Sequence, residues 1–194
     1  MVIGLTGGTG CGKTTALQVL QDMGAQCFDA DAVYHELLRT DAELLAAIER
    51  AFPGTVEHGE LQRKKLGAQV FGNPEKLRLL SSLTHPRVVQ AIRDRLQPGL
   101  VVIDAIALQE SGLDAICDCT VAVTAPKEAQ ITRIMAREGV SREYAAARVN
   151  AQRSADSFAE SCQFVLHNNG TQEEFCIKCR NLFEKLIKEK EING

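Results

Sequence analysis

The feature that most constrains this chain is a glycine-rich segment close to its first residue. Gly7-Gly8-Thr9-Gly10-Cys11-Gly12-Lys13-Thr14 fits the pattern G-x-x-x-x-G-K-[ST]. The apolar run 2–6 before it predicts a buried strand, and residues 13–23 after it have the pattern of a helix. A phosphate-binding loop requires this order of strand, turn and helix. The sequence therefore predicts that residues 7–14 and Thr15 bind the phosphates of a nucleotide.

Each part of this phosphate loop has a physical role. Glycines let backbone N–H groups curl around phosphate oxygens, and the helix start adds partial positive charge. We expect Lys13 to reach the β- and γ-phosphates as a catalytic residue, and Thr14 to give its hydroxyl to Mg²⁺. We therefore predict ATP as co-substrate and Mg²⁺ as cofactor. Cys11 is either a thiol activated by the helix start or, as we favour, a small filling residue.

Strands and helices alternate along the rest of the chain. Further strands are predicted at 26–28, 100–103, 120–123 and 164–166. Helices are predicted at 32–39, 41–52, 60–72, 74–96, 127–138, 141–152 and beyond residue 171. We expect an α/β fold of the P-loop NTPase type, with a parallel five-stranded sheet flanked by helices. Ligands of such sheets bind beyond the carboxyl ends of the strands.

The segment between the second and third strands is unusually long. Residues 32–99 look almost entirely helical, whereas a parallel crossover needs only roughly a dozen residues. We assign 32–99 to a helical acceptor lobe and 127–151 to a small helical lid. The nucleotide-binding core is then expected to comprise residues 1–31, 100–126 and 152–194.

Carboxylates follow two of the predicted strands. Phosphoryl transfer to an alcohol needs a group that orients the hydroxyl and accepts its proton. Asp29 and Asp31 would share a face in an extended stretch, so one can serve the metal and the other the acceptor. The alternative is a helix cap, and we favour Asp31 as the base. Asp104 either supports the metal or only satisfies a turn.

The segment 127–153 is basic within an acidic protein. It holds six Lys and Arg against three Glu, which gives 6 − 3 = +3. Arg133 and Arg137 lie one helical turn apart on one face. The position of this segment after the fourth strand favours a lid in which these arginines act on phosphate, over a solvated face of ion pairs.

Composition excludes several other classes of protein. The net charge is 22 − 25 = −3, which argues against general nucleic-acid binding. No apolar run reaches the roughly 18 residues of a membrane span. The N-terminus lacks a secretion signal, and the seven cysteines fit a reduced chain. We therefore expect a cytoplasmic monomer or small homo-oligomer, without nucleic-acid or membrane partners.

The motifs together resemble the dephospho-coenzyme A kinase family over nearly the whole chain. The resemblance rests on the phosphate loop, on Asp29-Ala30-Asp31 and on a series of further motifs. These are Leu61-Gln62-Arg63, Phe71-Gly72-Asn73-Pro74, Leu83 before Thr84-His85-Pro86, Gln130 with Arg133 and Arg137, Gln152, and Asn168-Asn169-Gly170. They occur in the order that the family shows.

The resemblance implies transfer of phosphate from ATP to the ribose 3′-hydroxyl of dephospho-coenzyme A, the last step of coenzyme A synthesis. It implies an adenylate-kinase-like core, with Asp31 as the base and Arg133 as a catalytic lid arginine. It places Asn168-Asn169-Gly170 near the ATP adenine, and we expect Arg137 and Asn169 to bind ATP. Asp29, Arg63 and His85 would bind the acceptor, although His85-Pro86 can instead start or bend a helix.

The chain departs from the family pattern at three places. Ile106-Ala107-Leu108-Gln109-Glu110 stands where the family usually shows Pro-Leu-Leu-Phe-Glu, on a wall expected to face the acceptor. Cys162-Gln163 replaces Ala-Asp before the last strand, and Cys11 replaces a usual Ser. We therefore expect the acceptor contacts near residues 106–110 to differ from those of the family pattern.

Other functions compete with this interpretation. A P-loop kinase of another small alcohol or nucleotide is the nearest alternative, but a nucleoside monophosphate kinase needs no carboxylate base. A GTP-dependent switch would need an Asn-Lys-x-Asp guanine reader, and this motif does not occur. A non-catalytic ATP-binding regulator is disfavoured by Asp31 and Arg133.

The first testable prediction concerns Lys13. Lys13→Ala removes the cation expected at the β- and γ-phosphates, so ATP turnover should fall to background. Steady-state ADP formation by the purified variant measures this loss. Normal turnover would remove the phosphate loop from the mechanism.

Overall fold

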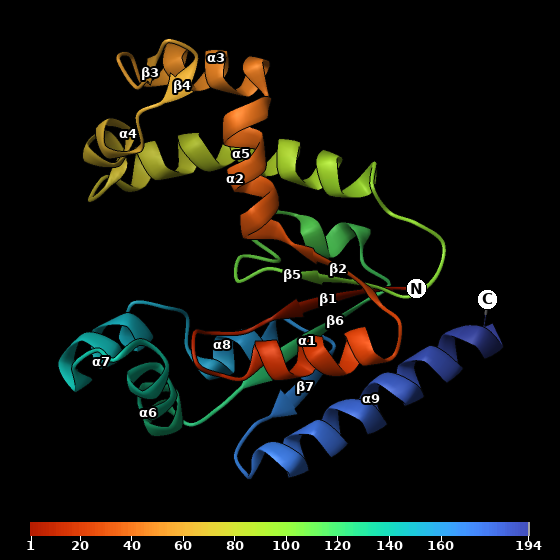
Figure 1. Cartoon of the computed structure of the whole chain (residues 1–194). Coiled ribbons are helices and arrows are strands. Elements are labelled where there is room, and N and C mark those ends of the chain that lie inside the picture. Colours follow the sequence, from red (N-terminus) through yellow and green to blue (C-terminus); the bar gives the residue numbers. More distant parts are fainter. Residues whose placement is uncertain (194) are drawn as a thin grey trace. The chain divides into compact units, whose positions relative to one another are not determined.

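The computed structural model describes residues 1–193, and these form two compact units (Figure 1). The core unit comprises residues 1–27, 97–109 and the described chain from 113 onward. The helical unit comprises residues 28–96 and 110–112. The assignment of residues 32–99 and 127–151 to functional domains stays a prediction. No described helix combines the length and the apolar character that a membrane crossing needs.

A five-stranded parallel sheet forms the middle of the core unit. Its strands are β1 (Val2–Thr6), β2 (Gln26–Asp29), β5 (Val101–Asp104), β6 (Cys119–Thr124) and β7 (Phe164–His167). They lie in the order β2-β5-β1-β6-β7, and Leu5 of β1 pairs with both Asp104 and Val121. Every residue of β6 is buried, as expected for a parallel sheet covered on both faces. The predicted strands are confirmed, with β5 shifted by one residue so that it ends on Asp104.

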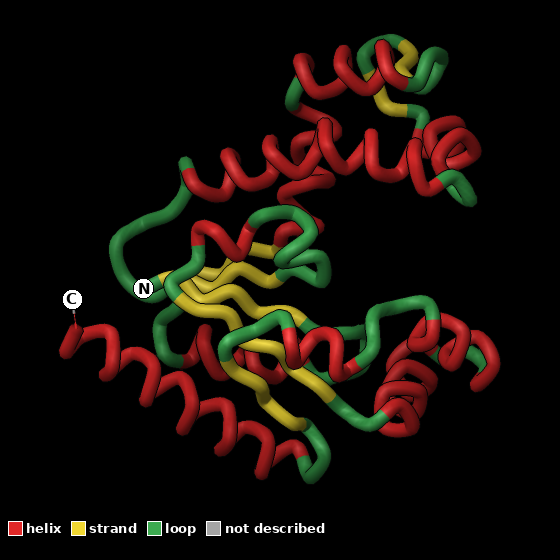
Figure 2. Tube along the Cα trace, turned by 180° about the vertical axis from the view of Figure 1, so that it is seen from behind, coloured by secondary structure: helices red, strands yellow, loops and turns green. Residues whose placement is uncertain are grey.

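Helices cover both faces of this sheet (Figure 2). On one face α1 (Lys13–Asp22) and α9 (Gln172–Asn193) pack together, and α8 (Ala155–Glu160) with the 3₁₀ helix η1 (Leu113–Ile116) lies on the other. Phe175, Cys179 and Phe183 follow the helical spacing along α9 and are at most 2 % exposed. They contact the buried side chains of β1 and α1, which fixes the helix that begins at the phosphate loop.

Two short helices of the core unit escaped the sequence prediction, whereas the two helices of the predicted lid are confirmed. The 3₁₀ helix η1 and α8 have four and six residues, too short to show a helical repeat. Helices α6 (Lys127–Glu138) and α7 (Arg142–Asn150) pack on each other through a small apolar cluster of their own. Gly139, with a φ of 65°, ends α6 and turns the chain toward α7.

The helical unit contains one element that the sequence prediction had wrong. Its helices are α2 (Ala30–Thr40), α3 (Ala42–Ala51), α4 (Arg63–Val70) and α5 (Pro74–Arg93). A short hairpin of β3 (Val56–Glu57) and β4 (Glu60–Leu61) precedes α4, where a helix over 60–72 was predicted. The Glu49 carboxylate accepts the N–H groups of residues 54–56 at 2.7–2.9 Å, which holds the chain in the hairpin. This tertiary contact has no local sequence signal.

The packing of α9 gives the second prediction. Phe183→Ala removes a fully buried ring and should lower the free energy of unfolding by about 3–5 kcal/mol. Ile177→Ala on the same helix is the matched control, because Ile177 is 60 % exposed and its loss should cost less than about 1 kcal/mol. Urea unfolding followed by circular dichroism measures both variants. Equal losses would contradict the buried role of this face of α9.

Candidate active site

The phosphate loop leads into a helix start that is open to an anion. Gly12, with a φ of 108°, is the N-cap residue of α1 and has no side chain that could cap the helix. Asp29, Asp41 and Asn73, in contrast, each cap a helix with a side-chain oxygen. A Cβ at Gly12 would lie 2.2 Å from Asn168 Nδ2, so only glycine fits there. The first N–H groups of α1 are thus left for a ligand such as phosphate.

Four cationic side chains converge on this loop. A cavity of about 270 Å³ is lined by Gly8, Thr9, Gly10, Gly12, Lys13, Thr14, Arg133, Arg137 and Arg148. Residues of the predicted loop therefore share one cavity with both predicted arginines. Arg148 was missed, because it lies eleven positions after Arg137 and only the packing of α7 on α6 brings the two arginines to one cavity. The concentration of positive charge suits a polyphosphate.

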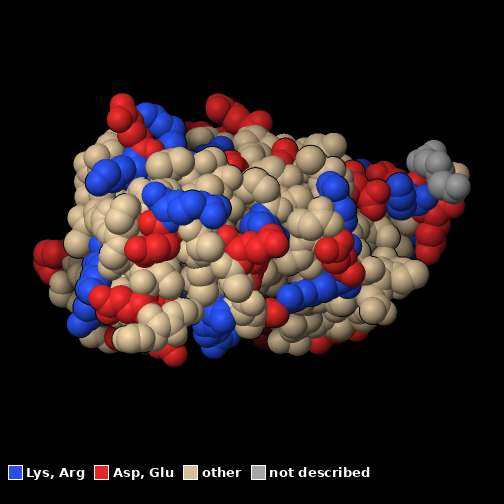
Figure 3. Space-filling model, turned by 90° about the horizontal axis from the view of Figure 1, so that it is seen from above, with Lys and Arg blue, Asp and Glu red and all other residues tan. Residues whose placement is uncertain are grey.

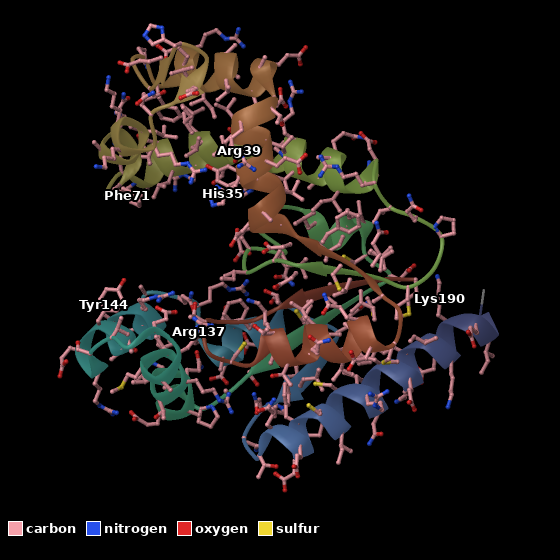
Figure 4. All side chains as sticks on the ribbon, in the orientation of Figure 1. His35, Arg39, Phe71, Arg137, Tyr144 and Lys190 are labelled. Carbon is pink, nitrogen blue, oxygen red and sulfur yellow. The ribbon has the colours of Figure 1, made fainter. Side chains whose placement is uncertain are left out.

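An acidic side chain on α6 holds two of these arginines. Glu138 accepts a hydrogen bond from Arg137 Nη2 at 2.5 Å and another from Arg148 Nη1. These contacts, with the Arg137 hydrogen bond first, lower the pKa of the Glu138 carboxyl. Figure 4 labels Arg137 near the end of α6 and Tyr144 on α7. Arg137 of α6 and Arg148 of α7 thus share Glu138 as a hydrogen-bond partner.

Thr14 and Asp104 are the predicted metal-binding residues. Asp104 ends β5, and its Oδ1 lies 3.6 Å from Lys13 Nζ. Thr14 follows Lys13 and lines the same cavity. No group of three or more His, Cys, Asp or Glu residues suited to a metal gathers within the part of the chain described. One hydroxyl and one carboxylate fit Mg²⁺, which takes its other ligands from phosphates and water.

Arg133 and Asn168 donate hydrogen bonds to carbonyl oxygens of the phosphate loop. Arg133 Nη1 donates to the carbonyl oxygens of Gly10 and Cys11 at 3.2 and 3.4 Å, and Nη2 donates to Asn168 Oδ1 at 3.1 Å. Asn168 Nδ2 also donates to Cys11 O at 2.9 Å. Of the predicted segment Asn168-Asn169-Gly170, the buried Asn168 is the residue whose side chain contacts the loop. Asn169 instead lines a separate cavity with Thr124, Pro126 and His167.

A further cavity lies on the α1 side of the phosphate loop. It has a volume of about 270 Å³ and is lined by Gly12, Thr15, Arg133, Asn168, Gln172 and Phe175. Arg133 and Gly12 line both this cavity and the one that holds Lys13. The two cavities thus adjoin along the loop, as a site for a nucleotide with several phosphates requires.

The thiol of Cys11 is packed rather than activated. Cys11 is 1 % exposed. Burial raises the pKa of its thiol, and this effect outweighs the lowering by the Lys13 charge. The interpretation of Cys11 as a small filling residue is therefore favoured over that of a reactive group.

The two aspartates after β2 have different surroundings. Asp29 Oδ1 accepts the N–H groups of Asp31 and Ala32 at 2.9 and 3.1 Å, so Asp29 caps α2. This cap starts α2 at Ala30, two residues earlier than predicted. Asp31 therefore lies in the first helical turn, and the expected extended stretch with both carboxylates on one face was wrong. The cap role that Asp31 was also a candidate for falls to Asp29.

The other acceptor candidates lie in the helical unit. Arg63 is the exposed first residue of α4. Burial raises the pKa of the Tyr34 hydroxyl, while Arg63 lowers it and Asp31 raises it, so Tyr34 lies near both charges. Figure 4 shows His35 and Arg39 following it along α2. Tyr34 and His35 were not among the predicted site residues.

His85 lies inside a helix rather than at its start. Helix α5 runs from Pro74 to Arg93 and continues through Pro86. His85 Nδ1 lies 3.1 Å from the carbonyl oxygen of Glu110. The suggestion that His85-Pro86 starts a helix was therefore wrong, and the ring has a structural partner.

Two of the departures from the family pattern touch each other. Gln109 Nε2 donates to Ser161 O at 3.0 Å and to Cys162 Sγ at 3.3 Å. Gln109 Oε1 is buried and has no hydrogen-bond partner within the described chain. Residues 109 and 162 therefore form one altered contact between the segment after β5 and the end of α8.

Comparisons with known proteins agree with this geometry. The family model described as dephospho-CoA kinase matches residues 1–174. A dephospho-CoA kinase of Carboxydothermus hydrogenoformans is 36% identical over 180 residues, which cover 89% of this chain and 87% of that protein. The crystal structure of TT1252 from Thermus thermophilus is 34% identical, covers 97% of each chain and has a TM-score of 0.76. A Campylobacter jejuni dephospho-CoA kinase shares the fold, with a TM-score of 0.58, 23% identity and coverage of 95% and 96%.

The burial of Cys11 gives the third prediction. Because a raised thiol pKa leaves little thiolate at pH 7, alkylation of Cys11 by iodoacetamide should be slower than that of the half-buried Cys176. The rate at Cys11 should rise as the pH increases above 8. Peptide mass mapping after timed alkylation at several pH values measures both sites. Faster labelling of Cys11 at pH 7, with protection by ATP, would restore the reactive interpretation.

Proposed function

The chain belongs to the dephospho-coenzyme A kinase family, and we propose that Asp31 activates the ribose 3′-hydroxyl of dephospho-coenzyme A for attack on the γ-phosphate of ATP. The family consists of transferases with an alcohol acceptor, and its reaction is the final step of coenzyme A biosynthesis. The observation that carries the transfer of phosphate from ATP is the cavity that Lys13, Arg133, Arg137 and Arg148 line together with the glycine loop. The role of Asp31 rests on the family resemblance and on its place in the first turn of α2.

The core unit would bind and polarise the triphosphate. Backbone N–H groups of the loop and of the start of α1 hold the phosphate oxygens, and Lys13 lies against the β- and γ-phosphates. Arg137 and Arg148 come from the α6–α7 pair, which we propose as the lid. When ATP binds, they would replace their hydrogen bonds to Glu138 by hydrogen bonds to phosphate oxygens. Arg133 holds the loop through Gly10 and Cys11 and presents its charge to the same cavity. These cations stabilise the charge that spreads over the transferred group.

We assign the nucleoside part of ATP to the cavity beside Thr15. Arg133 offers a planar guanidinium there, and Phe175 an apolar edge. Gln172 supplies an amide that can hydrogen-bond to a base. Asn168 supports this cavity from the loop after β7, whereas a contact of Asn169 with the adenine remains a prediction.

The helical unit would hold the acceptor. Asp29 fixes the first turn of α2 and so orients Asp31, whose carboxylate takes the proton of the attacking hydroxyl. We propose that Arg63 and His85 contribute to acceptor binding, with Tyr34 beside Asp31. A role of Asp29 in direct acceptor contact is the least supported of the predicted roles, because its Oδ1 caps the helix.

The family implies a divalent metal with ATP, and we propose Mg²⁺ held by Thr14 and Asp104. When bound, Mg²⁺ neutralises charge on the β- and γ-phosphates. We also propose a cytoplasmic protein that acts as a monomer or small homo-oligomer. On the face shown in Figure 3, Lys and Arg lie among Asp and Glu instead of forming one basic area, which supports the absence of a nucleic-acid partner.

A kinase of another small alcohol is the alternative that a specific observation favours. The contact of Gln109 with Cys162 alters the segment that the family resemblance places near the acceptor. The core chemistry would be the same, so only the acceptor distinguishes the two functions.

The fourth prediction tests both the acceptor and the base. Purified protein with ATP, Mg²⁺ and dephospho-coenzyme A should form coenzyme A and ADP, measured by mass-resolved chromatography. Asp31→Asn should lower kcat by about 10²–10⁴-fold, because the amide cannot accept the proton. Titration calorimetry should show unchanged ATP binding by this variant.

Asp29→Asn is the matched control, because Asn caps a helix about as well as Asp. It should keep most of the activity if Asp29 acts through the cap. An inactive Asp29→Asn beside an active Asp31→Asn would reverse the two roles. A folded, ATP-binding wild-type protein that forms no coenzyme A would leave the phosphate site intact and direct the search to other alcohols.

A further inference from the structure

Two glutamines connect the phosphate loop to the α6–α7 pair. Gln130 lies in α6, and Gln152 follows the end of α7. Gln152 Oε1 accepts the backbone N–H of Thr9 at 2.7 Å, and Gln152 Nε2 donates to Thr9 Oγ1 at 2.8 Å. One amide group therefore contacts both the backbone and the side chain of a single loop residue, 143 positions away in sequence.

The loop is shaped to fit these glutamines. A Cβ at Gly8 would lie 3.1 Å from Gln152 Oε1 and 3.3 Å from Gln130 Oε1. A Cβ at Gly10 would lie 2.8 Å from the carbonyl oxygen of Gln130. The buried Gln130 is itself held by a 2.8 Å hydrogen bond from Nε2 to Ala125 O. The segment 8–10 thus rests on the two glutamines, and glycines on either side of Thr9 permit the close approach.

Thr9 lies at the end of the loop that is remote from the nucleoside cavity. Gly12 and Thr15 line the cavity assigned to the nucleoside, whereas Gly8 and Thr9 line the cavity of Lys13, Arg137 and Arg148 and are not among the residues that line the nucleoside cavity. A nucleotide that enters with its base beside Thr15 therefore places its last phosphate near Thr9. This order rests on the proposed function of the two cavities.

We propose that Gln152 is a positioning residue that holds Thr9 in the shape required by the terminal phosphate of ATP. The amide is suited to this place because it uses a donor and an acceptor without adding charge beside an anion. Gln152 also follows the helix that carries Arg148. It therefore ties the remote end of the loop to the helix that supplies an arginine to the same phosphates.

The experiment compares ATP with ADP, since only ATP has the third phosphate. Gln152→Leu should weaken ATP binding about tenfold and leave ADP binding within about twofold, measured by titration calorimetry. It should also lower kcat for ADP formation at saturating ATP about tenfold, a change that lost stability alone would not give. Gln152→Glu keeps an acceptor for Thr9 but brings a negative charge to the terminal phosphate, so its ATP affinity should fall further.

Substitutions of Thr9 test the contact from its other side. Thr9→Ser retains both hydrogen bonds and should behave as wild type. Thr9→Val keeps only the backbone bond, so its loss should be smaller than that of Gln152→Leu. The double variant Thr9→Val/Gln152→Leu should be no worse than Gln152→Leu alone, because both changes remove the same contact.

Gln163→Leu is the structural control. Gln163 Oε1 accepts the N–H of Thr120 at 3.0 Å. This Gln–Thr contact resembles that of Gln152 with Thr9 but lies at the start of β6. The Gln163→Leu variant should have a lower unfolding temperature but the same ratio of ATP to ADP affinity as the wild type. Equal weakening of ATP and ADP by Gln152→Leu, or an unchanged kcat per folded molecule, would overturn the proposal. A wild-type protein that forms no coenzyme A would refute the acceptor, while the ATP-to-ADP ratio would still decide the role of Gln152.

Discussion

The structure depends on the glycine loop that leads into α1, which side chains from other elements hold in shape. Leaving the start of α1 without a side-chain cap gives up part of the stability that a cap adds to a helix. The surroundings offset this loss by holding the loop from the outside. Arg133 and Asn168 bind its carbonyl oxygens, and Gln152 binds Thr9. Residues of α6, of the segment after α7 and of the loop after β7 thus support the turn that follows β1.

The sheet and the larger helices could be predicted from the sequence, because hydrophobic periodicity and glycines at the ends of elements are local signals. The sequence could not predict the β3–β4 hairpin, at whose start the Glu49 side chain of α3 accepts backbone N–H groups. The phosphate loop could also be predicted, because its motif consists of eight consecutive residues and needs no information about tertiary packing. Arg148 was missed, since only the packing of α7 on α6 brings it to the cavity of the phosphate loop. The helix cap went to Asp29 instead of Asp31 because α2 starts two residues earlier than predicted.

The departures from the family pattern show how tertiary contacts change the meaning of a substitution. Taken separately, Gln109 and Cys162 look like independent losses of expected residues. In the structure the amide of Gln109 donates to the Cys162 sulfur and to the neighbouring Ser161 carbonyl oxygen. A polar side chain at one position is thus accommodated by a small, weakly accepting one at the other. The contact satisfies only the amide N–H of Gln109, because its buried Oε1 accepts no hydrogen bond within the described chain.

The path of the chain into and out of the helical unit has a consequence for how such proteins diversify. The chain leaves the core unit after residue 27 and returns at residue 97, on strands that neighbour each other in the sheet. Gln26 N–H donates to Leu100 O at 2.9 Å, so the two connections are held side by side. An insertion with adjacent ends can be lengthened, shortened or exchanged without breaking the sheet. Evolution can thus change or replace the helical unit, the proposed acceptor lobe, while the sheet and the phosphate loop of the core unit stay the same.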